Sequence, residues 1–477
     1  MFSIALRTPS KRCRLAESLT TRTLGGASCS SPRRASQQRR WASNPTWRPV
    51  SVLDNWVARE ARPISLRQLM VFGRSLTESR IISSANYVRT ELPVRYSPVP
   101  CIDSYAIPPP ALTRLRRIAH RLRDMQQLPY VVVTNPHIND VYNLYYDAFD
   151  CLRKLKEVKS LEDNDRLCDV IAQNLKSHLT VIPKLAMGIL ECGGLMDSAE
   201  LDKFMNTILR SRISRRVIAE QHLSLTETYN SSCFSPTAKL SESDFIGEVF
   251  IKCSAKDVID RCSRAVTALA RSTNGPDVLI PDVNVIGHLN ASFPYILSHI
   301  EYIVGELLRN SVQAVIDRWQ KSAEPSSPPP PIEVTICEAQ EHVIFRISDR
   351  GGGIPHNELP YLWSFSKGPQ SQNLLENLGQ VPRMAATLQE LHADDDAARA
   401  DVQTPPTYQC SLSSLTSRPP NLRLGIGLPL SRVYAEYWAG SLNLHSLEGY
   451  GVDAFLQISR LGNKNEQLTT RASIDAV

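Results

Sequence analysis

The stretch YIVGELLRNSVQAV, residues 302–315, decides the fold of the second half of this chain. Its apolar residues recur at helical spacing and predict a buried helix over residues 298–318. The same helix carries Glu306, Asn310 and Gln313 one turn apart along one face. An ordinary solvated face is one interpretation of this stripe. The other is a catalytic site, because a carboxylate and an amide at i and i+4 can hold a proton and a Mg²⁺ ion over one ligand.

Two glycine-rich segments follow this helix. In DRGGGIP, residues 349–355, an acid ends a strand and three glycines allow positive φ and close backbone approach. In LGIGLP, residues 424–429, Gly425 and Gly427 stand directly ahead of a predicted helix, whose first amide groups form an anion site. Each segment alone also fits a plain tight turn or a helix cap.

Alternating strands surround these glycine-rich segments. PIEVTICEA (331–339) and HVIFRISD (342–349) alternate in period two and predict an antiparallel hairpin. SLNLHSL (441–447) and VDAFLQI (452–458), separated by EGYG, predict a second hairpin. Together with the helices between them they indicate an α/β domain over residues 245–463.

The preceding half, residues 50–235, has helical periodicity throughout and predicts a four-helix bundle. Within LCDVIAQNLKSHLTVIPKLAMGILECGG (167–194), Pro183 should kink the helix and the final glycine pair should end it. His178 is interpreted as a packing residue and not as a phosphate acceptor. The next helix carries four arginines that form a solvated face or position an acidic surface of a partner, namely Arg210, Arg212, Arg215 and Arg216.

The N-terminus differs in composition from the rest. Residues 1–53 contain ten Lys or Arg and one acid, which accounts for more than the whole formal net charge of +6. This composition predicts a mitochondrial transit peptide over residues 1–45, with a disordered basic tail as the alternative. The remainder is slightly acidic, so a nucleic-acid partner is not expected. No apolar run reaches the roughly 18 residues of a membrane span.

Cysteines and low-complexity segments limit the other possibilities. The eleven cysteines include no C-x-x-C pair, so neither a disulfide framework nor a structural zinc is expected. Residues 321–331 form a Pro-rich loop, and 464–477 a flexible tail. The polar stretch 369–423 lies between the two glycine-rich segments and is predicted to be a disordered, mobile lid.

In this order, E-L-x-x-N, D-x-G-x-G and G-x-G-L resemble the gyrase, histidine-kinase and MutL ATPase superfamily. Within it, the chain looks like the mitochondrial 2-oxoacid dehydrogenase kinases, which act on the pyruvate and branched-chain complexes. HLTVIPKLAMGI (178–189) and MNTILRSRISRRVIAEQH (205–222) in the bundle carry this resemblance, together with the segments quoted above and the continuation of the last one to Gly451. The expected fold is therefore α+β, with a four-helix bundle followed by an α/β-sandwich ATP-binding domain of histidine-kinase type.

The resemblance implies a matrix protein-serine kinase that uses ATP and Mg²⁺ and inactivates the dehydrogenase subunit of such a complex. It implies Glu306 as general base, Asn310 as Mg²⁺ ligand, Asp349 as acceptor of the adenine amino group, and a homodimer docked on the lipoyl-bearing acyltransferase. The nucleotide-binding residues that it implies are Glu306, Leu307, Leu308, Arg309, Asn310, Ser311, Gln313, Asp349, Gly351, Gly353, Ser366, Lys367, Leu424, Gly425, Ile426, Gly427 and Leu428.

Some positions depart from the family pattern. Arg423 replaces the first glycine of the phosphate segment, Val452 replaces a threonine, and Ser366-Lys367 replaces a Ser/Thr pair. These departures leave a second possibility, a pseudokinase that regulates the complex by binding alone. A third is an ATPase or histidine kinase of the wider superfamily. Tyr302 resembles the branched-chain members, but the motifs themselves do not choose between the two substrate complexes.

Overall fold

The computed structural model describes most of the chain after residue 61. The described residues are 62–74, 76–96, 125, 129–230, 245–275, 278–321, 328–366, 371–381, 383–384 and 422–468. All of them belong to one compact unit. The predicted transit peptide, Lys367, the boundary expected near residues 235–245 and most of the predicted lid lie outside the described residues.

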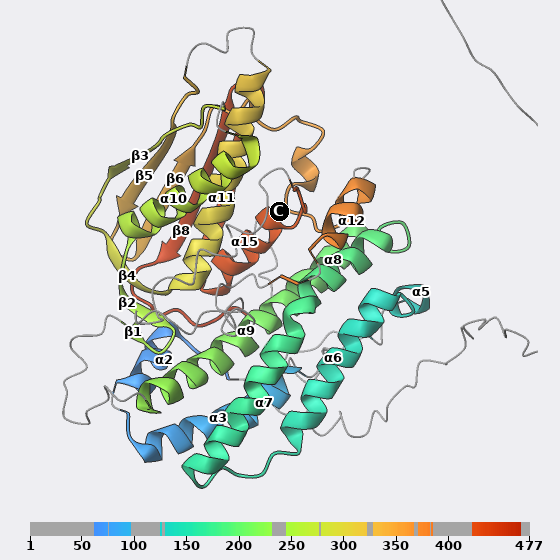
Figure 1. The fold of residues 1–477 in the computed structure, drawn as a ribbon, viewed down its shortest axis with the longest axis vertical. Coiled ribbons are helices and arrows are strands. Elements are labelled where there is room, and N and C mark those ends of the chain that lie inside the picture. The colour runs from blue at the N-terminus through green and yellow to red at the C-terminus, as the bar shows by residue number, and fades with distance from the viewer. Residues whose placement is uncertain are drawn as a thin grey trace, which may run out of the picture. The chain divides into compact units, whose positions relative to one another are not determined.

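Helices make up the described chain as far as Asn230 (Figure 1). In chain order they are α2 (Leu66–Gly73), α3 (Glu78–Tyr96), α5 (Tyr130–Val133), α6 (Pro136–Arg153), α7 (Leu161–Ser177), the 3₁₀ turn η1 (His178–Thr180), α8 (Val181–Glu191) and α9 (Ser198–Asn230). Helix α3 packs on α9 and α6, and α6 packs on α8. With α7 continuing through η1 into α8, these helices form the expected four-helix bundle. In the described part of the chain, no helix is both long and apolar enough to cross a membrane.

The break between α7 and α8 has its origin in Pro183. Proline has no backbone N–H to offer the carbonyl four residues earlier, which here belongs to Leu179. The turn at that point is a 3₁₀ turn, and the Leu179 carbonyl instead accepts a hydrogen bond of 3.0 Å from the Met384 amide. The predicted kink is confirmed, and α8 ends at Glu191, just before the glycine pair.

Sheets and helices alternate after residue 245. The elements are β1 (Phe245–Ile246), β2 (Val249–Ser254), α10 (Ala255–Asn274), β3 (Val283–Gly287), β4 (Ser292–Ile296), α11 (Leu297–Gln320), β5 (Ile332–Glu338), β6 (His342–Ser348), η3 (Leu359–Tyr361), α12 (Ser371–Gly379), α15 (Gly427–Tyr437), β7 (Ser441–Leu447) and β8 (Gly451–Ser459). The main sheet has the order β3-β5-β6-β8-β7, and β1-β2-β4 form a smaller one. Both predicted hairpins, β5–β6 and β7–β8, are antiparallel as expected.

Helices α10, α11 and α15 cover one face of the main sheet (Figure 1). Strand β6 alternates accordingly, because Val343, Phe345 and Ile347 are buried while Arg346 on the opposite face is exposed. The predicted helix is α11, which is two residues longer at its C-terminal end than expected. This α/β arrangement places the three motif segments beside one another.

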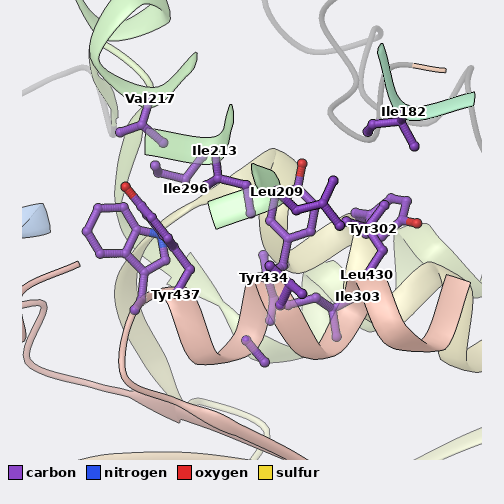
Figure 2. Close-up of a cluster of buried hydrophobic side chains, with 14 of the residues drawn as sticks. Ile182, Leu209, Ile213, Val217, Ile296, Tyr302, Ile303, Leu430, Tyr434 and Tyr437 are labelled. Carbon is purple, nitrogen blue, oxygen red and sulfur yellow. The ribbon is translucent and has the colours of Figure 1, made fainter. Parts of the chain in front are cut away.

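The bundle and the α/β part share a continuous core through α9 and α15. Figure 2 shows Leu209 and Ile213 of α9 close to Leu430 and Tyr434 of α15. All four side chains are at most 2% exposed. Helix α15, which begins at the second glycine-rich segment, is therefore packed directly against the bundle.

The four arginines of α9 do not form a surface, so both interpretations of them from the sequence are wrong. They are between 1% and 4% exposed. Arg210 pairs with Glu436 of α15 and Arg216 pairs with Glu220, while the Arg215 guanidinium lies 4.4 Å from the centre of the Tyr145 ring. Buried charges persist only with such partners, so these side chains stabilise the core.

His178 is a buried packing residue, as expected from the sequence. Its Nε2 lies 3.3 Å from the Leu144 carbonyl, and its ring meets the edge of Tyr145 at 5.5 Å. Burial and the neighbouring Arg215 lower the pKa of His178 to about 3. The imidazole is therefore neutral and packs within the bundle.

Part of the predicted disordered lid is helical, which corrects the expectation for residues 371–379. Helix α12 packs against α8, with Leu378 fully buried and Leu374 and Leu375 half-buried. The spacing of these three leucines produces one apolar face, and α8 covers it. The overall polarity of 369–423 hid this short amphipathic segment.

The expected flexible tail is also wrong for its first residues. Glu466 is 3% exposed, accepts a hydrogen bond from the Tyr437 hydroxyl and accepts another of 3.1 Å from the Ile64 amide. Asn465 pairs with Ser65 in an antiparallel bridge. A buried carboxylate with two donors anchors this segment, while residues 469–477 lie outside the described ones.

Candidate active site

A cavity of about 110 Å³ lies between α11 and the main sheet. Its lining is largely apolar, with Asn310, Ser311 and Asp349 as the polar side chains. The residues that line it are Leu307, Asn310, Ser311, Ala314, Asp349, Gly353, Ile354, Leu428, Leu444, Val452 and Ala454. An apolar slot with one carboxylate fits a flat heteroaromatic base that carries an amino donor.

Asp349 is held rigidly in this cavity. Its Oδ1 accepts hydrogen bonds from the amides of Gly351 at 2.9 Å and Val452 at 3.3 Å, and its Oδ2 accepts one from the Ser311 hydroxyl at 2.9 Å. Burial raises the pKa of Asp349 above its usual value, although these three hydrogen bonds act in the opposite direction. These three hydrogen bonds fix the orientation of the carboxylate. Oδ2 can accept one further hydrogen bond in addition to the one from Ser311.

The DRGGG turn depends on its glycines. Gly352 and Gly353 have φ of 98° and 75°, in the left-handed region. A Cβ atom on Gly353 would lie 2.3 Å from the Leu447 carbonyl oxygen, and one on Gly351 would lie 2.5 Å from the Ala314 methyl group. Gly353 therefore shapes the cavity wall, while Gly351 lets the turn pack against α11.

Glu306 lies one helical turn before Asn310 on α11 and is 2% exposed, so this carboxylate is not part of a solvated face, whereas Asn310 is exposed. Its Oε2 accepts a hydrogen bond of 2.6 Å from Nη2 of Arg309. A Cβ atom on Gly427 would lie only 2.3 Å from the same oxygen. The carboxylate therefore lies against the first residue of α15.

The second glycine-rich segment turns sharply into α15. Gly425 has φ of 73°, and α15 begins at Gly427 without a side-chain cap. Leu424 and Ile426 are buried and fix this turn to the core, while Leu428 faces the cavity. The amide groups of Gly427 and Leu428 open α15 without a carbonyl partner in their own helix, and such a helix start favours a nearby anion.

Three predicted site residues lie elsewhere. Leu308 is buried in the core and does not line the cavity. Gln313 donates to Asp317 at 2.6 Å. Ser366 is 6% exposed and lies 2.5 Å from the Ser198 hydroxyl at the start of α9. Serine 366 thus attaches the segment before the lid to the bundle.

Two of the departures from the family pattern have clear environments. Arg423 pairs with Asp317 at 2.9 Å and is 71% exposed at its side chain, so its cation is directed to the end of α11. The Val452 carbonyl accepts a hydrogen bond from the Asp349 amide, the Val452 amide donates to Oδ1 of Asp349, and the Val452 side chain adds to the apolar wall. Neither residue obstructs the cavity.

Five lining residues were missed in the sequence. Ala314 follows Asn310 by one helical turn, and Ile354 follows the three glycines, so both had a local signal. Leu444, Val452 and Ala454 enter the cavity only because β7 and β8 lie beside β6. Their positions depend on strand pairing and not on a local motif.

Two family models match different parts of the chain. Residues 63–98 and 112–250 match the family model of the mitochondrial branched-chain alpha-ketoacid dehydrogenase kinase. Residues 297–460 match the model of the histidine kinase-, DNA gyrase B- and HSP90-like ATPases. The fold and the cavity thus define a nucleotide-binding domain of histidine-kinase type, joined to a helical bundle.

Relatives match the chain over most of its length. Pyruvate dehydrogenase (acetyl-transferring) kinase 2, mitochondrial, of Saccharomyces cerevisiae is 31% identical over 87% of this chain and 85% of its own. The corresponding kinase of Arabidopsis thaliana is 28% identical over 88% and 97%, and isozyme 4 of Homo sapiens is 25% identical over 84% and 82%. The chain belongs to the mitochondrial 2-oxoacid dehydrogenase kinase family, and it is a kinase that uses ATP.

Proposed function

We propose that this protein is a protein-serine kinase of the mitochondrial matrix that phosphorylates the dehydrogenase subunit of the pyruvate dehydrogenase complex and thereby inactivates it. The relatives that match nearly the whole chain are named for pyruvate dehydrogenase, which favours that complex over the branched-chain one. Tyr302 carries little weight in this choice, because it is buried against Tyr434 at 5.3 Å between ring centres.

The observation that carries this proposal is the convergence of three segments on α11. Asp349 faces the cavity beside the middle of this helix. Gly427 lies against Glu306, which is nearer the N-terminal end of the helix. About two turns of α11 therefore lie beside three features of the site. These are a base-binding slot, an anion-binding helix terminus and a buried carboxylate. Phosphoryl transfer requires mainly such alignment of groups together with neutralisation of charge.

Each residue has one task in this scheme. Asp349 accepts the amino group of adenine, and the amide groups at the start of α15 hold phosphate oxygens. Glu306 takes the proton from the serine hydroxyl once Arg309 releases its Oε2. The nucleotide supplies the phosphoryl group and leaves as the diphosphate. A Mg²⁺ ion held through the side-chain oxygen of Asn310 would neutralise charge on the phosphates.

The remaining assignments extend this proposal to the whole chain. Residues 1–45 direct import and are removed, residues 50–235 dock on the lipoyl-bearing acyltransferase, and residues 245–463 carry catalysis. Two copies of the chain associate as a homodimer. Ser366 and α12, which lead into the proposed lid, are packed on the bundle.

The substrate is tested by incubating the purified kinase with ATP-Mg²⁺ and either dehydrogenase complex. We expect acid-stable phosphate on a serine of the pyruvate dehydrogenase subunit, with loss of its activity. Phosphate on the branched-chain enzyme alone would correct the substrate. Acid-labile phosphate on the kinase would indicate a histidine kinase, and ATP binding without any transfer would indicate a pseudokinase.

Replacement of Asn310 by alanine is expected to remove the Mg²⁺-dependent part of ATP affinity. Asn310 is exposed at the cavity edge, and Mg²⁺ prefers oxygen ligands such as an amide carbonyl. Turnover should fall at least about tenfold, since metal charge stabilisation contributes several kcal/mol. Titration of ATP with and without Mg²⁺ measures the effect.

The matched control for that variant is Asn139→Ala on an exposed face of α6. It should leave both affinity and turnover unchanged. Equal Mg²⁺ dependence in wild type and Asn310→Ala would remove Asn310 from the metal site.

A further inference from the structure

Arg318, in the last turn of α11, holds two separate turns with one guanidinium group. Its Nη1 donates to the carbonyl oxygens of Arg350 at 3.0 Å and Tyr450 at 2.6 Å. Its Nη2 donates to the carbonyl oxygen of Gly449 at 2.9 Å. Three hydrogen bonds therefore join the end of α11 to the DRGGG turn and to the β7–β8 turn.

These two turns form one wall of the cavity. They are joined directly, since the Gly352 amide donates to Tyr450 at 3.1 Å and the Gly449 amide donates to Gly352 at 2.8 Å. Asp349 and Gly353 line the cavity from the first turn, and Val452 follows the second. Any shift of this pair of turns moves the carboxylate that faces the base.

The backbone of both turns needs support from outside. Gly352, Gly353 and Gly449 have φ of 98°, 75° and 83°. Glycines lose more conformational freedom on folding than other residues, so a turn that contains several of them is easily displaced. The planar fork of an arginine presents several donors in fixed directions, and a lysine presents one point charge.

An ordinary helix cap does not explain this arrangement. A cation in the last helical turn is usually favourable because it lies near the carbonyl groups of its own helix. The three acceptors of Arg318 lie 32, 131 and 132 residues away in the chain. Arg318 therefore makes a tertiary contact, which joins the end of α11 to the two turns that form the cavity wall.

We propose that Arg318 is a positioning residue for the nucleotide base, which acts by fixing the DRGGG turn and the β7–β8 turn against α11. The proposal rests on the proposed function, in which this cavity receives adenine. Arg318 itself lies outside the lining of the cavity and is exposed, so its replacement leaves the core intact.

The first experiment compares backbone amide exchange in wild type, Arg318→Met, Arg318→Lys and the surface control Arg166→Met, all without nucleotide. Arg166 is 72% exposed and pairs only with acids of its own helix among the contacts described. In Arg318→Met, exchange should accelerate at the amides of Gly352 and Gly449, with α9 unchanged. The exchange rates of Arg318→Lys should lie between those of wild type and Arg318→Met. The exchange rates of Arg166→Met should match those of wild type. Unchanged exchange at both glycines would overturn the proposal whether or not ATP binds.

The second experiment measures KM for ATP and kcat with the dehydrogenase complex as substrate. Arg318→Met should raise KM about tenfold or more, because loss of charge-assisted hydrogen bonds misplaces Asp349. Its kcat at saturating ATP should stay within about threefold, and Arg318→Lys should recover part of the affinity. A KM within about twofold of wild type, or an equal loss in kcat, would contradict a positioning role. If wild type neither binds nor uses ATP, the proposed function fails, and the exchange data still decide whether Arg318 fixes the turns.

Discussion

Replacement of Glu306 by glutamine is expected to abolish phosphoryl transfer while ATP binding persists. Glutamine has the shape of glutamate and keeps an oxygen that accepts the hydrogen bond from Arg309, so the packing against Gly427 is retained. It cannot accept the proton of a serine hydroxyl. Since a positioned base contributes about 10² to 10⁴ in rate, kcat should fall by that factor.

Single-turnover transfer to the dehydrogenase and the Kd for ATP are the two quantities to measure on this variant. Glu227→Gln provides a matched control, because Glu227 is an exposed carboxylate in the last turns of α9. It should leave both quantities unchanged. Transfer at the wild-type rate in Glu306→Gln would refute the role of Glu306 as base.

The second large effect is expected for Gly427→Ala. The added methyl group would lie 2.3 Å from Oε2 of Glu306 and 3.8 Å from Nη2 of Arg309. One of the two elements must move, either the carboxylate or the start of α15. Displacement of about 1 Å at a catalytic group lowers the rate roughly 10²-fold, so we expect at least that loss in kcat/KM.

We expect Gly427→Ala to lose activity without a matching loss of thermal stability. Gly427 has no positive φ and opens a helix, where alanine is favoured over glycine by up to about 1 kcal/mol. The melting temperature should therefore change little although activity is lost. Gly194→Ala is the control, because a Cβ atom there meets nothing within 4 Å. Full activity of Gly427→Ala would show that Glu306 and this segment need not be in contact.

Local patterns in the sequence determined the class of fold and the centre of the site. Residues that are neighbours in the chain produce the alternating pattern of strands 332–338 and 342–348. They also produce the helical period of 297–320. Asp349, Gly353 and Leu428 belong to short motifs whose spacing follows from a turn or a helix start. Such features are predictable because a few adjacent residues satisfy their own hydrogen bonds and packing.

Other features were decided only by tertiary structure. The arginines of α9 look like a surface in the sequence, but they are buried, and Glu436 of α15 and Tyr145 of α6 provide partners for Arg210 and Arg215. Residues 371–379 and Glu466 belong to segments that look loose in the sequence, but α12 packs on α8 and Glu466 is buried with a hydrogen bond from Tyr437. Arg318 resembles an ordinary surface residue, although its three acceptors come from turns far along the chain. In each case the stabilising contact joins segments that are distant in the chain. The side chain is therefore buried, and has its partner, only after the chain has folded.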